Sequence, residues 1–163
     1  MPSSPDLRSS DAAFNLNRFL QAQENDYERA LSEIRSGQKR THWMWYIFPQ
    51  LEGLAFSSTA KHYSIKSIQE ARAYLTHPVL GPRLLECAEA VVQIKGRSAN
   101  EIFGYPDDLK LRSCATLFEY VSPSGSVFKQ LIEEYYGGER DHKTLALLDT
   151  TLGGNSGTGQ SLQ

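Results

Sequence analysis

His42 is the leading candidate for a catalytic side chain in this sequence. It begins the run His-Trp-Met-Trp-Tyr-Ile-Phe, which ends at Phe48. An imidazole titrates near neutral pH, so it suits a general base or a ligand donor. The competing interpretation is a structural histidine that satisfies a neighbouring backbone group and packs on Trp45.

Four polar or aromatic side chains near His42 could complete a pocket. Lys39 and Arg40 precede the aromatic run and could hold an anion near a helix N-terminus, or they could be ordinary surface charges. Trp45 could stack on a flat ligand, although aromatic residues at this density are commonly part of a core. Gln50 follows the run where a loop begins, so its amide could bind a ligand or close the turn.

A second group of candidates lies further along the chain. Lys110 and Ser113 share one face of a predicted helix at i and i+3 spacing. A lysine beside a serine could activate it as a nucleophile, but an ordinary surface helix explains the same spacing. The candidate ligand-binding residues are Lys39, Arg40, Trp45, Gln50, Lys110 and Ser113.

Several common chemical motifs are absent from the sequence. The four histidines and two cysteines show no paired ligand spacing, so no metal site is predicted. There is no P-loop, no Gly-rich dinucleotide turn and no Gly-x-Ser-x-Gly elbow. The sequence therefore indicates no particular cofactor, and it leaves open whether the protein is an enzyme.

Apolar residues at helical spacing, with capping signals, predict the elements that position these side chains. The predicted helices cover residues 16–34, 67–76, 79–94, 98–103, 106–120, 127–136 and 141–148. Within residues 41–51, the six residues Trp43 to Phe48 are all apolar or aromatic and leave no polar face, so we expect a buried central helix there with Thr41 as its N-cap. A buried strand is the alternative for this short run. Because alternating patterns are weak elsewhere, we predict a compact, all-α, multihelical domain.

Length and composition fit one soluble domain. The chain has 163 residues, of which 40% are hydrophobic and 22% are charged. We expect a single domain over 14–151, a flexible N-terminal arm over 1–13, and a flexible Gly/Ser-rich tail over 152–163. Cys87 and Cys114 lie among apolar residues and are expected to be buried and reduced.

Charge and hydropathy bear on partners and location. A net charge of −2 gives no general attraction to polyanions, so nucleic-acid binding is not expected. The sequence shows neither a signal peptide nor a run long enough to span a membrane, which predicts a cytoplasmic protein without membrane contact.

The aromatic run also carries a family resemblance. The sequence resembles the bacterial family of unknown function numbered 1810, whose members are sometimes mislabelled calpastatin. The matching residues include Gly37-Gln-Lys39, His42 to Leu51, Gly53-Leu54, Ser57, Tyr63-Ser-Ile65, Glu70-Ala71, Tyr74-Leu75, His77-Pro78, Leu80-Gly81, Arg83-Leu84, Ile102-Phe-Gly104, Asp108-Leu-Lys-Leu111 and Thr116-Leu-Phe118. The resemblance covers about residues 14–140 and implies a compact multihelical fold with buried central helices. It implies no activity.

Two functions remain open at this point. The first is a protein that binds a small, anionic or nucleotide-like molecule in a polar and aromatic pocket near His42. The alternative is a protein–protein interaction module without pocket chemistry. That alternative predicts an exposed apolar patch that includes Phe56 or the pair Tyr135-Tyr136.

Overall fold

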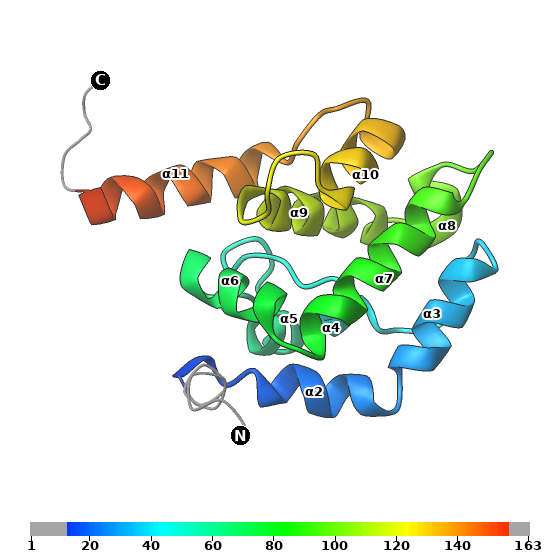
Figure 1. The fold of residues 1–163 in the computed structure, drawn as a ribbon, viewed down its shortest axis with the longest axis horizontal. Coiled ribbons are helices and arrows are strands. Elements are labelled where there is room, and N and C mark those ends of the chain that lie inside the picture. The colour runs from blue at the N-terminus through cyan, green and yellow to red at the C-terminus, as the bar shows by residue number, and fades with distance from the viewer. Residues whose placement is uncertain (1–12, 157–163) are drawn as a thin grey trace.

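The computed structural model describes residues 13–156, and these residues form helices joined by short loops (Figure 1). The helices are α2 (Asn17–Glu24), α3 (Tyr27–Arg35), α4 (Met44–Ile47), α5 (Ser58–Tyr63), α6 (Ile68–Thr76), α7 (Leu80–Gln93), α8 (Ala99–Phe103), α9 (Asp107–Tyr120), α10 (Val127–Tyr136) and α11 (His142–Ser156). Within 13–156 the only extended pairing is an isolated bridge between Leu51 and Ile65. The all-α prediction is therefore confirmed.

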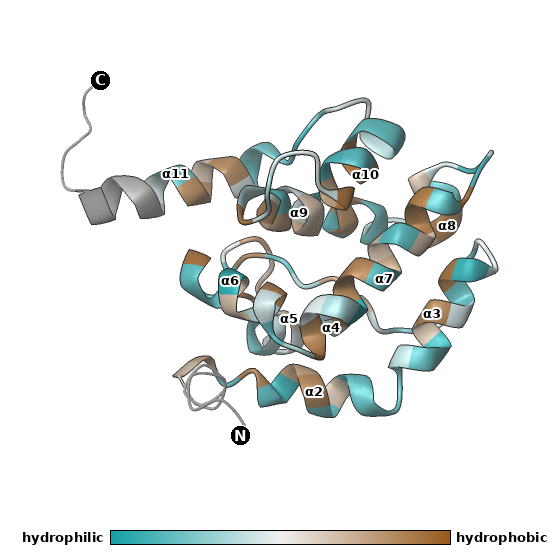
Figure 2. Cartoon of the chain, viewed as in Figure 1, coloured by the Kyte–Doolittle hydropathy of each residue, from teal (hydrophilic) through white to brown (hydrophobic). Residues whose placement is uncertain are grey.

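Helices α7 and α9 organise the packing. Helix α7 packs against α3, α6 and α10, and α9 packs against α6, α8, α10 and α11 (Figure 1). The largest fully buried side chains include Trp43, Tyr74, Phe19 and Phe118. Hydrophobic and hydrophilic stretches alternate along the helices in Figure 2, which is the pattern of amphipathic helices around a shared core. No helix within 13–156 has the length and hydrophobicity of a membrane span.

Several helix ends are set by local signals that the sequence displays. The Ser98 side chain accepts a hydrogen bond from the Glu101 N–H, and the Glu101 carboxylate accepts one from the Ser98 N–H. Ser67 accepts from the Glu70 N–H and begins α6. Gly137 ends α10 in the left-handed conformation, at φ 62°. These predicted boundaries are confirmed.

Other boundaries differ from the prediction. The predicted helix over 16–34 is two helices, because the chain turns at residues 25–26, where the Asp26 carboxylate accepts hydrogen bonds from Tyr46 and Arg29. Helix α5 was not predicted, and it begins where the Ser57 hydroxyl accepts from the Ala60 N–H. Helix α11 continues beyond residue 148 into the segment predicted as a tail. Residues 1–12 of the predicted arm and 157–163 of the tail lie outside the described residues.

A buried ion pair joins α2 to α6. The guanidinium of Arg18 lies 2.7 Å from the Glu70 carboxylate, and the two side chains are 6% and 1% exposed. The other guanidinium hydrogen bonds go to four backbone carbonyls, those of Phe14, Asn15, His62 and Ser64. Because all of these partners are internal, Arg18 fixes the start of α2 against the segment between α5 and α6.

Candidate functional site

The aromatic run is held in place by one carboxylate, that of Glu33 at the end of α3. It accepts hydrogen bonds from the N–H groups of Arg40 and Thr41 at 2.8 and 3.0 Å. It also accepts from the Thr41 hydroxyl at 2.7 Å and from the Trp43 indole at 2.8 Å. Trp43 is fully buried, so this contact satisfies a donor that has no access to water.

These contacts correct the prediction for residues 41–51. The segment is buried at Trp43, Met44, Ile47 and Phe48, but it is helical only over the one turn of α4. Thr41 is not the N-cap, because its hydroxyl is donated to Glu33. Trp43 occupies the cap position without a side-chain cap.

The hydrogen bonds also set the acidity of Glu33. Burial alone would raise the pKa of this carboxyl group, but the donors on Arg40, Thr41 and Trp43 outweigh that effect. The pKa falls from its usual 4.5 to about 2. Glu33 is therefore ionised across the physiological pH range.

We expect Glu33 to make folding sensitive to acid. The unfolded chain binds this proton more tightly than the folded chain, so stability is lost as pH falls from 4.5 towards 2. One proton taken up on unfolding corresponds to a slope of about 1.4 kcal/mol per pH unit. Urea unfolding of the wild type and of Glu33→Gln between pH 6 and pH 2.5 measures this contribution. An equal pH dependence in both proteins would contradict it.

Lys39 serves as a second anchor for the aromatic run. Its ammonium lies 2.9 Å from the Asp107 carboxylate and donates to the Thr41 carbonyl at 2.6 Å. The same ammonium is 5.0 Å from the centre of the Trp43 ring, and the side chain is only 6% exposed. The Lys39 ammonium, which was predicted to hold an anion, is thus already paired with Asp107. This pair joins the loop before α4 to the first turn of α9.

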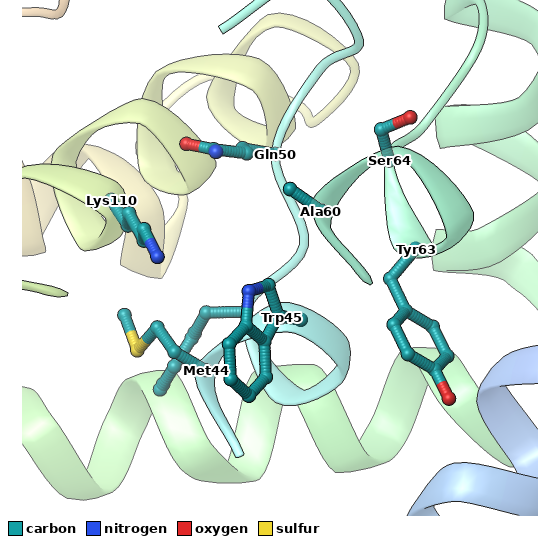
Figure 3. Close-up of a pocket in the computed structure, with 8 residues that line it drawn as sticks. Met44, Trp45, Gln50, Ala60, Tyr63, Ser64 and Lys110 are labelled. Atoms are coloured by element: carbon teal, nitrogen blue, oxygen red, sulfur yellow. The ribbon is translucent and has the colours of Figure 1, made fainter. Parts of the chain in front are cut away.

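Three of the predicted site residues meet at a small cavity. Trp45, Gln50 and Lys110 line it together with side chains from α4 and α5 (Figure 3). The lining residues are Met44, Trp45, Phe48, Gln50, Ala60, Tyr63, Ser64 and Lys110. About 10 Å³ is open to the centre of a water molecule, which is room for about one water. The fold thus brings Lys110 next to Trp45 and Gln50, which lie far from it in the sequence.

The polar groups at this cavity lack strong protein partners. Within the described residues, neither the Trp45 indole N–H nor the Gln50 side-chain amide makes a hydrogen bond. The Lys110 ammonium lies 5.5 Å from the Trp45 ring centre, and its ion pair with Asp107 is long, at 3.7 Å. Asp107 is shared with the closer ammonium of Lys39. At this cavity the Trp45 indole and the Gln50 amide thus have no hydrogen-bond partner among the described residues, and Lys110 has only the long contact with Asp107.

A wider groove continues outward from the cavity. Gln50 and Lys110 line both spaces, so they stand at the junction between them. The remaining groove residues come from the loop after Gln50, from α9 with the residue before it, and from the start of α11: Leu54, Ala55, Pro106, Leu109, Ser113, Asp141 and Lys143. About 330 Å³ of the groove is open to the centre of a water molecule.

His42 and Arg40 are not brought to this site. The His42 side chain is exposed, lines neither the cavity nor the groove, and forms no hydrogen bond or ring contact with any residue in 13–156. One interpretation of His42 placed its ring in a ligand pocket, and the other packed it on Trp45. The ring instead precedes α4 on the outside of the fold. Arg40 is also exposed, and its guanidinium lies 3.4 Å from the Ser36 hydroxyl.

The predicted lysine–serine pair does not form. The Ser113 hydroxyl donates to the Leu109 carbonyl one turn earlier, at 3.2 Å. The Lys110 ammonium points instead toward Trp45 and Asp107. Ser113 therefore lines the groove as a polar wall residue and is not arranged as an activated nucleophile.

Residues 13–148 match the family described as "Protein of unknown function (DUF1810)". The protein belongs to this family. Its fold is similar to that of the conserved hypothetical protein Rv1873 from Mycobacterium tuberculosis, known from a crystal structure at 1.38 Å. That similarity has a TM-score of 0.83 and 51% sequence identity, and it covers 84% of this chain and 98% of the other. No curated protein matches the chain.

Some residues at the DUF1810 site escaped the sequence analysis. Tyr63 is contributed by the unpredicted α5, Asp141 directly precedes α11, and Lys143 lies in its first turn. The anchor Asp107 was visible as a carboxylate three residues before Lys110, a spacing typical of helical ion pairs. The role of Glu33 could not be recognised from residue spacing, because its hydrogen-bond partners Arg40, Thr41 and Trp43 follow α3 across a loop.

Two further predictions have clear outcomes in this DUF1810 structure. Cys87 and Cys114 are buried and free, as expected, and burial raises the pKa of the Cys87 thiol to about 12. Neither thiol has the acidity of a nucleophile. Tyr135 and Tyr136 are half-buried, and their hydroxyls donate to backbone carbonyls. They do not form the exposed patch that the interaction-module alternative predicted, whereas Phe56 is 71% exposed.

Proposed function

We propose that this protein binds a small molecule across the cavity and groove that meet at Gln50 and Lys110. The observation that carries the proposal is that Trp45, Gln50 and Lys110 line one cavity, where the Trp45 indole and the Gln50 amide have no hydrogen-bond partner among the described residues. Both groups are half-buried and still reach solvent, so a ligand would replace water as their partner. A ligand oxygen would supply the missing acceptor.

The size of the groove supports the same proposal. Pockets for small molecules and cofactors typically enclose about 300–1,000 Å³ and combine apolar walls with a few polar groups. The groove has about 330 Å³ and follows that composition, with Leu54, Pro106 and Leu109 beside Gln50 and Lys110. The inner cavity adds room for one water, which a ligand group could displace.

The charge at the junction favours an anionic ligand. The Asp107 carboxylate lies 2.9 Å from the Lys39 ammonium and 3.7 Å from that of Lys110, so Lys39 is its closer partner. The Lys110 side chain is 25% exposed, so its ammonium can be reached by a ligand. Because Ser113 and His42 are not positioned as nucleophile or base, the proposal is one of binding.

A thermal-shift screen of the wild type and Lys110→Met tests this proposal. The panel contains nucleotides, nicotinamide and ADP-ribose derivatives, phosphosugars and amino acids. A ligand at about one hundred times its Kd adds roughly 2.7 kcal/mol, which raises Tm by about 5–11 °C in a domain of this size. We expect that shift to shrink by more than half in Lys110→Met, because the variant keeps the packing on Trp45 and loses the charge.

His42→Ala is the matched control, since His42 is exposed and lies outside the groove. We expect it to keep both the Tm and the ligand-induced shift of the wild type. A shift abolished in His42→Ala and retained in Lys110→Met would place the binding site elsewhere. The absence of a shift with every compound would contradict small-molecule binding by this protein.

A further inference from the structure

We propose that Lys39 is a positioning residue of this site, because it occupies the Asp107 carboxylate and so keeps the Lys110 ammonium available to an anionic ligand. This role rests on the proposed function, since it concerns the cation at the junction of the cavity and the groove. Lys39 lines neither of these spaces, so it would act on a ligand only through Asp107 and Lys110.

The Asp107 carboxylate lies between two ammonium groups from different parts of the chain. Its Oδ2 atom is 2.9 Å from the Nζ atom of Lys39, and its Oδ1 atom is 3.7 Å from the Nζ atom of Lys110. Asp107 is the first residue of α9, and Lys110 follows at i+3, a spacing at which side chains on a helix can pair closely. Asp107 nevertheless makes its closer pair with the lysine that lies outside α9.

Lys39 is fixed in its position by several contacts. Its ammonium donates to the Thr41 carbonyl at 2.6 Å, and its backbone N–H donates to the Ile102 carbonyl at 2.7 Å. The side chain is only 6% exposed, and the ammonium lies 5.0 Å from the centre of the Trp43 ring. A buried charge requires partners of this kind, so we expect the pair of Lys39 with Asp107 to persist in the folded protein.

The Lys110 ammonium has no comparable partner. Within the described residues it forms no hydrogen bond, and its contacts are the long pair with Asp107 and the Trp45 ring, whose centre is 5.5 Å away (Figure 3). The carboxylate among the groove-lining residues is that of Asp141, which accepts from the Thr144 N–H at 3.0 Å and from the Thr144 hydroxyl at 2.5 Å. The ammonium therefore stays beside the cavity because neither carboxylate binds it closely.

Removing the Lys39 charge would reverse this arrangement. The Asp107 carboxylate would lose its close partner, and Lys110 is the other cation within ion-pair distance of it in the described part of the chain. Because opposite charges attract more strongly as they approach, Lys110 would move from its long contact into a close pair with Asp107. The cation would then be withdrawn from the cavity, and an anionic ligand would find its charge already neutralised.

Competitive acetylation of the lysines with acetic anhydride tests this role without a ligand. The measured quantity is the rate of Lys110 labelling relative to that of Lys129, an exposed lysine on α10, read by mass spectrometry. We expect this ratio to fall about threefold in Lys39→Met, which is the size expected for one additional, partly exposed ion pair. The variant Lys39→Met/Asp107→Asn should restore the wild-type ratio, because it also removes the carboxylate that captures Lys110.

A role of Lys39 in the fold alone gives a different result. Loosening of the loop before α4 would expose Lys110 and raise its labelling, and the loss of Asp107 would not reverse that change. Lys39→Arg keeps the positive charge and should keep the wild-type ratio. If circular dichroism shows that Lys39→Met is unfolded, Lys39→Gln removes the same charge with an amide that can still donate to the Thr41 carbonyl.

The thermal-shift panel provides a second readout, for binding. An anion of the panel that raises the Tm of the wild type should lose most of its shift in Lys39→Met and regain it in the double variant. A loss that the double variant does not reverse, or an unchanged labelling ratio in Lys39→Met, would overturn the role of Lys39 and leave anion binding at Lys110 intact. If the labelling ratios change as expected and no compound shifts the Tm, the proposed function fails while the role of Lys39 in placing Lys110 stands.

Discussion

Replacing Glu33 with alanine is expected to lower the free energy of unfolding by about 4 kcal/mol, because it removes four hydrogen bonds and leaves buried donors unpaired. The Trp43 indole N–H is the most costly of these donors, since the ring is fully buried and Glu33 is its hydrogen-bond acceptor. The N–H groups of Arg40 and Thr41 are nearer to water and contribute less. For a domain of this size the loss corresponds to a fall in Tm of roughly 8–16 °C.

Urea unfolding monitored by circular dichroism at pH 7 measures the effect. Glu28→Ala is a suitable control, because Glu28 lies on the same helix and is exposed. We expect the control to stay within about 0.5 kcal/mol of the wild type. A Glu33→Ala protein within 1 kcal/mol of the wild type would show that the aromatic run is held in place by packing alone.

Arg18→Met is expected to cost about 3–5 kcal/mol, because it leaves the Glu70 carboxylate buried without its counter-charge. Glu70 is 1% exposed, and its remaining acceptor contact is with the Lys66 N–H at 2.8 Å. Methionine fills most of the volume of the arginine stem, so the loss reports mainly on charge and hydrogen bonding. Chemical unfolding again provides the measurement.

Arg29→Met and a double variant make this test specific. Arg29 forms an exposed pair with Asp26 at the start of α3, so we expect its loss to cost less than 1 kcal/mol. The variant Arg18→Met/Glu70→Met should be clearly more stable than the sum of the two single changes predicts, because it leaves no unpaired buried charge. Simple additivity of the two changes would mean that the ion pair contributes no coupling.

Local signals in the sequence predicted most of the helices. Serine caps at positions 67 and 98, the glycine at 137 and the proline at 78 act within a few residues, so their effect can be read without knowledge of the fold. The matching boundaries of α6 to α10 follow from them. Lys110 and Ser113 lie on one of these helices, α9, so their position on a helix could be predicted from the sequence.

The errors arise where contacts between distant residues override local preference. The break between α2 and α3 coincides with the hydrogen bond from Tyr46 to Asp26, and α4 is shortened where Glu33 fixes the preceding loop. Neither contact is visible as a spacing. An apolar run of six residues predicts burial well, but it does not determine how many of its residues are helical.

Contacts between distant residues also limit how much of the candidate site the sequence can predict. Trp45, Gln50 and Lys110 are polar or aromatic groups beside buried segments, and the fold places them around one cavity. His42 has the chemistry of a base, yet its side chain is exposed, just before the first turn of α4. The direction of a loop side chain depends on the anchors around it, and those anchors are set by the tertiary fold.

The unequal burial of the two tryptophans gives the protein a pair of independent optical reporters. They are the only indole groups in the chain, and they are two residues apart. Trp43 is sealed in the core against a carboxylate, so its emission follows unfolding and is protected from a dissolved quencher such as acrylamide. Trp45 is half-buried beside an ammonium at the cavity, so its emission responds to whatever occupies that space. Replacing either one with phenylalanine separates the optical signal of folding from the optical signal of binding.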